Sequence, residues 1–264
     1  MADKKPRILV SNDDGYFSEG LRALVDAVSP LGEVWVVAPD REQSAASHSI
    51  SLNRPLRITE VREHWYAVDG TPADSAYLAI HHLMKDDRPR IMVSGINHGA
   101  NLADDVNYSG TVAAAREAAL LGIPSIAFSL VSRAPFDFQH GARFARSLVA
   151  AALAQPQLPS RMLLSVNIPR GEPTGYAITR LGRHSYGYDV VEKEDPRGRK
   201  YYWIGGNSYE HQDIPGSDCN AVHLDRRISV TPLNFELTDT QALAALAGWN
   251  LEGFPRLDVG RGGD

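Results

Sequence analysis

Two adjacent carboxylates, Asp13 and Asp14, stand between Asn12 and Gly15, shortly after the strand-like run Arg7–Val10. Neighbouring side chains of an extended chain point to opposite faces, so this pair can bind one cation only if the backbone turns, and Gly15 permits a turn. Two like charges this close raise each other's proton affinity unless a cation lies between them. An Asx turn with a helix cap is the alternative, because Asn and Asp favour both. The pair therefore indicates either a metal site or a turn.

Oxygen-bearing side chains also follow two further apolar runs. Ser44 comes after the run 34–38, and Asn97 comes after the run 91–93. Carboxylate, hydroxyl and amide oxygens suit a hard cation, whereas zinc favours His and Cys, and no HxxxH or CxxC pattern is present. We therefore expect one divalent cation per subunit, Mg²⁺ or Mn²⁺, in a site that Ca²⁺ can also occupy. The two aspartates would neutralise its charge, and Ser44 and Asn97 would add neutral oxygens.

A short polar turn, Ser109–Gly110–Thr111, precedes the alanine-rich stretch 112–121. The N-terminus of a helix presents unpaired N–H groups and can bind a phosphate, although Ser and Thr are also ordinary N-caps. The turn lacks the spacing and the lysine of a Walker A loop, and no GxGxxG follows the first apolar run. A metal beside a phosphate cradle favours phosphoester chemistry, and a dinucleotide cofactor is disfavoured.

The elements that must position these residues alternate between strand and helix. Short apolar runs predict buried strands at 8–10, 34–38, 65–68, 91–94, 125–130 and 162–166, with looser β-structure over 50–61. Helical spacing predicts helices over 21–28, 72–84, 112–121 and 144–153, the second with Thr71 as its N-cap and Pro72 as its first residue. This alternation predicts an α/β fold with right-handed crossovers, whose ligands bind at the carboxyl ends of the strands.

The pattern changes after about residue 170. Three β-like pieces follow at 176–181, 201–204 and 228–231, with no clear helix between 176 and 232, and a last helix is expected over 240–249. We predict a core over residues 1–170 and a β-rich extension with a C-terminal helix over 171–264, built as one continuous unit.

Composition narrows the class of protein. The 264 residues carry a formal charge of -5, which argues against broad binding to nucleic acid or to an anionic membrane. No apolar run is long enough to span a bilayer, and the charged start shows no secretory segment. Cys219 is the only cysteine, so no disulfide within the chain is possible. We expect a soluble cytoplasmic protein.

Several long motifs, taken in order, closely resemble the stationary-phase survival protein SurE family from residue 7 to about residue 235. The matching segments are 10–15 (VSNDDG), 38–41 (APDR) with Ser44, 70–74 (GTPAD), 94–101 (SGINHGAN), 108–115 (YSGTVAAA), 195–198 (DPRG) and 229–233 (SVTPL).

The resemblance implies a divalent-metal-dependent 5'-nucleotidase acting on nucleoside monophosphates, often with broader phosphatase or polyphosphatase activity. It implies Asp13, Asp14, Ser44 and Asn97 as metal ligands. It also implies a Rossmann-like three-layer core with a mostly parallel sheet, β-hairpin arms, and a C-terminal helix used to form a homodimer or homotetramer.

The mechanism we infer has Asp13, Asp14 and Asn97 acting through the metal, which activates a water molecule. We expect the phosphate to be held by Asn12, Asn101, Ser109, Gly110 and Thr111. Direct attack by an aspartate is a rival, but aspartyl-phosphate enzymes typically carry their aspartates at i and i+2. The acid for the leaving group is open, since His98 lies near the site in sequence but could equally be a surface residue. A zinc deacetylase and a nucleotide sensor without turnover are the alternatives outside phosphatase chemistry.

Overall fold

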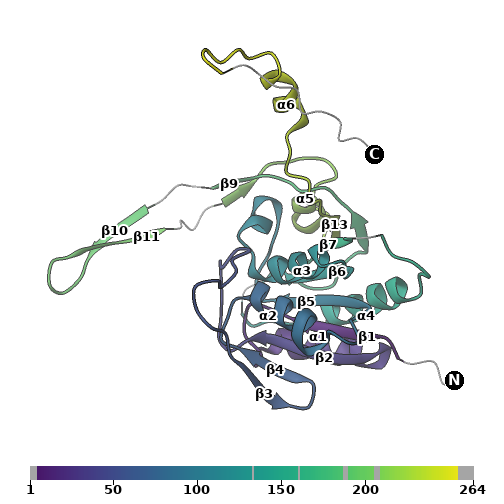
Figure 1. Cartoon of the computed structure of the whole chain (residues 1–264). Coiled ribbons are helices and arrows are strands. Elements are labelled where there is room, and N and C mark those ends of the chain that lie inside the picture. The colour runs from purple at the N-terminus through teal and green to yellow at the C-terminus, as the bar shows by residue number, and fades with distance from the viewer. Residues whose placement is uncertain (1–4, 133, 160, 187–189, 205–208, 255–264) are drawn as a thin grey trace. The chain divides into compact units, whose positions relative to one another are not determined.

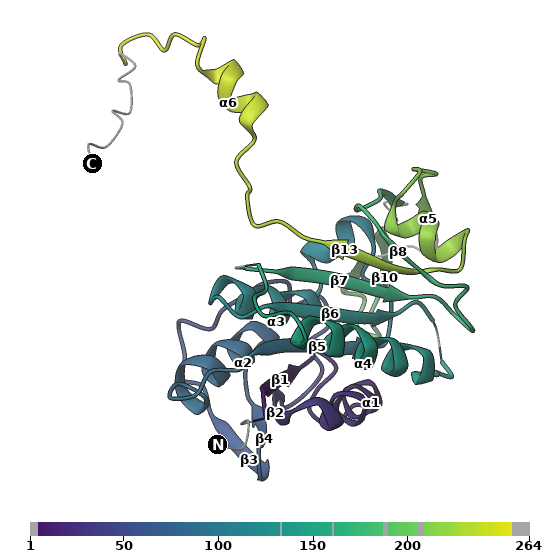
Figure 2. The same cartoon turned by 90° about the vertical axis from the view of Figure 1, so that its right-hand side faces the viewer.

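The structure is a computed structural model that describes residues 5–132, 134–159, 161–186, 190–204 and 209–254. The chain divides into two compact units, Met1–Leu233 and Asn234–Asp264. The first unit is built on a nine-stranded sheet with the strand order β3-β4-β2-β1-β5-β6-β7-β13-β8. Figures 1 and 2 show these strands side by side with helices on both faces of the sheet.

Six neighbouring strands of the sheet run parallel, from β4 through β7, and the strands at its two ends bring in antiparallel pairs. Strand β3 pairs antiparallel with β4, and β13 pairs antiparallel with β7 but parallel with β8. The strand bounds are β1 Arg7–Ser11, β2 Glu33–Pro39, β3 Ile58–Arg62, β4 Trp65–Val68, β5 Ile91–Asn97, β6 Ser125–Leu130, β7 Leu163–Ile168, β8 Tyr176–Ile178 and β13 Ile228–Pro232.

Two pairs of helices cover the two faces of the sheet. Helix α1 packs on α4, and α2 packs on α3. The bounds are α1 Glu19–Val28, α2 Pro72–Leu78 with a π-helical turn Ala79–Leu83, α3 Gly110–Leu120, α4 Gln139–Leu153 and α5 Asp218–His223, with 3-10 turns Ser29–Leu31 and Ala103–Asn107.

Alternation along the central strand assigns the two faces. Ile8 and Val10 of β1 belong to the apolar cluster that contains residues of α1 and α4. Leu9 is equally buried and lies between them, so it points to the opposite face, which α2 and α3 cover. Burial on both faces is what makes these strands read as continuous apolar runs. The sequence prediction of an α/β fold with a mostly parallel sheet is confirmed.

Most predicted elements are found, and the capping prediction is confirmed in detail. The side chain of Thr71 accepts a hydrogen bond from the backbone N–H of Asp74, and Pro72 is the first residue of α2. Two expectations were wrong. Residues 50–57 form no strand: the chain bends at Asn53 and Arg54, and Pro55 has no N–H to donate to a neighbouring strand. Helix α5 lies where no helix was expected, since six residues are too few to show helical periodicity.

Between β8 and α5 the chain forms two small antiparallel pairs. Strand β9 (His184–Tyr186) pairs with β12 (Tyr209–His211), and β10 (Val190–Glu194) pairs with β11 (Lys200–Ile204). We call residues 184–211 the hairpin arm; in Figure 1 its tip stands away from the sheet. The second unit contains helix α6 (Thr240–Leu246), capped by Asp239. None of the described helices has the length and apolar character required to cross a membrane.

Candidate active site

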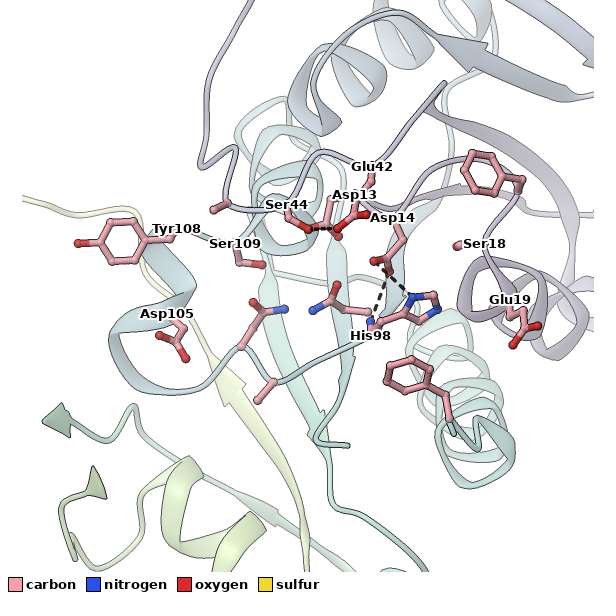
Figure 3. A pocket seen from close by; sticks show the side chains of 16 residues that line it. Asp13, Asp14, Ser18, Glu19, Glu42, Ser44, His98, Asp105, Tyr108 and Ser109 are labelled. Atoms are coloured by element: carbon pink, nitrogen blue, oxygen red, sulfur yellow. Dashed lines mark hydrogen bonds and ion pairs between the residues drawn. The ribbon is translucent and has the colours of Figure 1, made fainter. Parts of the chain in front are cut away.

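A cavity of about 750 Å³ lies at the carboxyl ends of β1, β2 and β5, beside the N-terminus of α3 (Figure 3). This is where ligands bind in open α/β sheets, because the loops that leave neighbouring parallel strands meet there. The residues lining it are Asp13, Asp14, Phe17, Ser18, Glu19, Glu42, Ser44, Ala45, Asn97, His98, Ala100, Asn101, Asp105, Tyr108, Ser109 and Phe136. All four predicted metal ligands are therefore brought to one cavity.

The loop after β1 combines the two interpretations of its sequence, since it is a turn that also presents both carboxylates. Gly15 has a φ of +96°, a conformation that other residues rarely adopt. The side-chain amide of buried Asn12 donates to the carbonyl oxygen of Gly15 at 3.0 Å and to Ser18 Oγ at 2.8 Å. Asn12 thus holds the turn together from within the loop, and it does not line the cavity.

Asp13 is almost fully buried, with 6% of its surface exposed. Burial raises its pKa to about 7; the hydroxyl of Thr111, which donates to Asp13 Oδ1, lowers it in part, and the charge of Asp14 raises it further. Gly110 permits this close approach, because a Cβ there would lie 2.7 Å from Asp13 Cβ. The start of α3 therefore supports Asp13 directly.

Asp14 is the second carboxylate at the cavity floor. Burial raises its pKa to about 6, a hydrogen bond from the backbone N–H of His98 lowers it, and the charge of Glu42 raises it. That N–H lies 3.3 Å from Asp14 Oδ2, and His98 Nδ1 lies 3.6 Å from Asp14 Oδ1. Both aspartates therefore carry raised pKa values chiefly because they are withdrawn from water.

The two neutral candidates both line the cavity and come from different strand ends. Ser44, in the loop after β2, donates its hydroxyl to Glu42 Oε1 at 2.5 Å. Asn97, at the end of β5, donates its side-chain N–H to the carbonyl oxygen of Gly99 at 3.0 Å. Because the nitrogen of Asn97 is used in this way, its oxygen is the atom with which it can contact a cation.

Apart from Asn12, which does not line the cavity, the predicted phosphate-binding residues fall into two groups. Ser109 and Asn101 line the cavity, whereas Gly110 and Thr111 lie behind Asp13 and support it. Ser109 is the N-cap of α3 and accepts from the backbone N–H of Val112 at 3.1 Å. Figure 3 shows Ser109 facing the space between Ser44 and Asp105.

Three carboxylates in the cavity wall were not found by sequence reasoning. Glu42 stands two residues before Ser44, and this closeness could have indicated that Glu42 belongs to the site. No neighbouring residue in the sequence indicates the same for Glu19 or Asp105. With Asp13 and Asp14 they bring the lining to five carboxylates, and no Lys or Arg is among the lining residues. An anionic substrate would be repelled by such a wall without a cation.

His98 lines the cavity and is part-buried. Its ring stacks on Phe136 with centroids 4.8 Å apart, and burial lowers the pKa of its imidazole. Its buried Nε2 has no hydrogen-bond partner among the residues that the structure describes. The neutral ring can therefore accept or donate one proton inside the cavity.

The donor set fits a hard divalent cation. The described residues contain no cluster of three or more His, Cys, Asp or Glu side chains suited to a metal, so a cation here would need neutral oxygens beside the two aspartates. Two adjacent carboxylates, one buried and one part-buried, with neutral hydroxyl and amide oxygens nearby suit Mg²⁺ or Mn²⁺ when waters and substrate complete the shell. Asp13, Asp14, Ser44 and Asn97 are the residues that would hold it.

Fold and site together define an open α/β protein with an acidic, oxygen-rich site at the carboxyl ends of its parallel strands. The family model described as survival protein SurE matches residues 8–188, and the chain belongs to this family.

Known relatives agree with that assignment. Over 257 residues the chain is 76% identical to 5'-nucleotidase SurE of Myxococcus xanthus (strain DK1622), covering 97% of this chain and 98% of the relative. It is 55% identical over 251 residues to 5'-nucleotidase SurE of Anaeromyxobacter dehalogenans (strain 2CP-C), covering 95% and 98%. A crystal structure of the SurE protein from Aquifex aeolicus superimposes with a TM-score of 0.81 at 40% identity, covering 91% of this chain and 98% of that one.

Proposed function

We propose that this chain is a divalent-metal-dependent 5'-nucleotidase that hydrolyses nucleoside monophosphates to nucleoside and phosphate. The relatives described above carry the name 5'-nucleotidase SurE. The observation that carries the proposal is the pair of buried Asp13 and part-buried Asp14 in a cavity lined by five carboxylates and no Lys or Arg. A phosphate monoester can enter this cavity only when a cation neutralises its floor.

The residues take separate roles in this reaction. Asp13, Asp14, Ser44 and Asn97 hold the cation, one per subunit, and Thr111 fixes the carboxylate of Asp13. A bound Mg²⁺ or Mn²⁺ supplies charge neutralisation and lowers the pKa of a coordinated water. Ser109 and Asn101 face the cavity where phosphate oxygens would lie.

Water is the preferred nucleophile over an aspartate. Asp13 is buried and receives the hydroxyl of Thr111, while Asp14 accepts the backbone N–H of His98. Carboxylates held in this way are oriented as ligands and lose nucleophilicity to their hydrogen bonds. His98 is the residue best placed to exchange a proton with the leaving oxygen, because it lines the cavity and its pKa is lowered by burial.

Phosphate release from AMP tests the proposal. We expect release with Mn²⁺ or Mg²⁺ and none with excess chelator, and Asp13→Asn should lose about 100-fold or more while keeping its fold. Asp26→Asn, the same change at an exposed site on α1, is the matched control. If no divalent metal supports release although AMP binds, the protein is a nucleotide sensor and the proposal is wrong.

Other phosphate monoesters and the terminal phosphate of polyphosphate present the same phosphoryl group to the cation, which acts on that group and not on the base. We include this broader phosphatase and exopolyphosphatase activity in the proposal. Release of phosphate from p-nitrophenyl phosphate and from polyphosphate, under the conditions that hydrolyse AMP, tests it.

Assembly into a homodimer or homotetramer, in the cytoplasm, completes the proposal. Each of the two units carries exposed apolar side chains, which support the proposed assembly. In β11 Trp203 is 63% exposed and Ile204 is 92% exposed, and in the second unit Leu243 is 60% exposed and Trp249 is 65% exposed. Contiguous exposed apolar surface typically marks an interface.

A further inference from the structure

One wall of the cavity is formed by a segment with little regular structure, residues 101–109. It carries Asn101, Asp105, Tyr108 and Ser109, all of which line the cavity. A single 3-10 turn, Ala103–Asn107, is its only element. Its position must therefore be set largely by side chains from elsewhere in the chain.

Helix α5 supplies the first of these contacts through Asp218. This carboxylate is fully buried, and its Oδ2 accepts the backbone N–H of Ala103 at 2.9 Å. Its Oδ1 accepts the N–H groups of Gly182 at 2.7 Å and Cys219 at 2.8 Å. Ala103 has a φ of +50°, so Asp218 ties the segment at a point where its backbone is strained.

The base of the hairpin arm supplies the second contact through His184, whose side chain is 1% exposed. Its Nδ1 lies 3.4 Å from Asp105 Oδ2, and its Nε2 lies 3.5 Å from Cys219 Sγ. Packing here is tight, since a Cβ on Gly182 would lie 2.8 Å from Cys219 Sγ. Leu102 and Ala103 pack against Cys219 and Val222 in one small apolar cluster.

The order Cys219–His184–Asp105 resembles a nucleophilic triad, but the cysteine does not support that chemistry. Cys219 is fully buried, and burial raises the pKa of its thiol to about 12, so no thiolate is available to attack. The cluster therefore acts through the position of Asp105 and of the segment that carries it.

We propose that His184 and Asp218 are positioning residues, which hold the segment 101–109 so that Asp105, Tyr108 and Ser109 form the substrate-binding wall. The catalytic consequence rests on the proposed nucleotidase function. It also follows that the base of the hairpin arm and the active site are linked, because β9 begins at His184, which contacts Asp105 of the wall.

Two substitutions of one residue separate the contacts. In His184→Asn the amide nitrogen replaces Nδ1 and keeps the contact with Asp105, whereas in His184→Gln it replaces Nε2 and loses that contact. We expect His184→Gln to raise the KM for AMP about tenfold with kcat changed less than threefold, and His184→Asn to stay near wild type. His82→Gln, at an exposed position, is the matched control.

Hydrogen exchange measured by mass spectrometry on the metal-free full chain gives a readout that does not depend on activity. We expect faster exchange over residues 101–109 in His184→Gln and in Asp218→Asn, but not in His184→Asn, at unchanged exchange in β1 and β5. If Asp218→Asn does not fold, the comparison of His184→Gln with His184→Asn alone decides the test.

The possible failures are distinguishable. If residues 101–109 of His184→Gln exchange hydrogen at the same rate as in the wild type, the positioning role is overturned, whatever the activity of the variant. Faster exchange with an unchanged KM would overturn its catalytic consequence. If the wild-type chain releases no phosphate, the proposed function fails, and the exchange measurement still decides whether the two residues position the wall.

Discussion

Replacing Gly110 by alanine tests whether the start of α3 holds Asp13 in its working position. A Cβ at residue 110 would lie 2.7 Å from Asp13 Cβ and 3.0 Å from Asp13 Oδ2. Carbon atoms in contact are best separated by about 3.5–4.0 Å, so one of the two segments must move by roughly 0.8 Å or more. The backbone of Gly110 is not in the left-handed region, and alanine favours a helix, so the methyl group itself is the perturbation.

A displacement of about 1 Å in a catalytic group can lower the rate by about 100-fold, equivalent to roughly 2.7 kcal/mol in the barrier. We therefore expect kcat/KM for AMP to fall about 100-fold in Gly110→Ala, with weaker apparent binding of Mn²⁺. Steady-state phosphate release over a Mn²⁺ titration measures both quantities, and circular dichroism checks that the fold is retained.

Gly248→Ala is the matched control, because a Cβ there would meet only Ala245 O at 3.6 Å, an ordinary distance. If Gly110→Ala kept kcat/KM within threefold of the wild type, the contact between α3 and Asp13 would not control the position of the metal-binding pair, and the reasoning would be refuted.

Three further predictions follow from the same site and from the arm. Thr111→Val removes the hydroxyl that lowers the pKa of Asp13, so the acid limb of the pH–activity profile should move to higher pH. Glu42→Gln removes the charge that raises the pKa of Asp14, so the acid limb should move to lower pH. In either variant, a shift in the opposite direction would contradict the assignment for that aspartate. The pKa of Asp13 is about 7 in the folded chain and about 4 in the unfolded chain, so the wild type without metal should lose stability as the pH rises from about 4 to about 7. Over the same pH range the Tm of Asp13→Asn should rise relative to the Tm of the wild type. A difference in Tm between the two proteins that does not depend on pH would refute the assignment. Trp203→Glu on exposed β11 should shift the protein toward monomer in light scattering, and an unchanged mass would exclude this surface as the interface.

Features carried by contiguous residues were predictable. Thr71 and Pro72 mark a helix start because capping depends on side chains within one turn, and the capping box is present. The parallel strands were predictable because burial on both faces leaves unbroken apolar runs such as Ile91–Val93. The placement of oxygen donors after these runs was sufficient to predict that Asp13, Ser44 and Asn97 meet at one sheet edge.

Features that depend on distant partners were not predictable. Helix α5 is too short to show periodicity, and its Asp218 gains its role only when folding brings it to Ala103. Asp105 gave no signal because its place in the cavity wall is set by His184 and by the path of an irregular segment. Gly110 and Thr111 were expected to bind phosphate directly, whereas their described contacts support Asp13; whether they also bind phosphate stays a prediction.

The sequence by itself determined the chemical types of the ligands and the strand ends on which they stand, because a turn, a cap and a buried strand are properties of neighbouring residues. Only the tertiary structure decided how those ligands are supported. Thr111 reaches Asp13 across 98 positions, and Asp218 reaches Ala103 across 115. Such contacts depend on how the helices and loops pack on the sheet, and no local pattern records that packing.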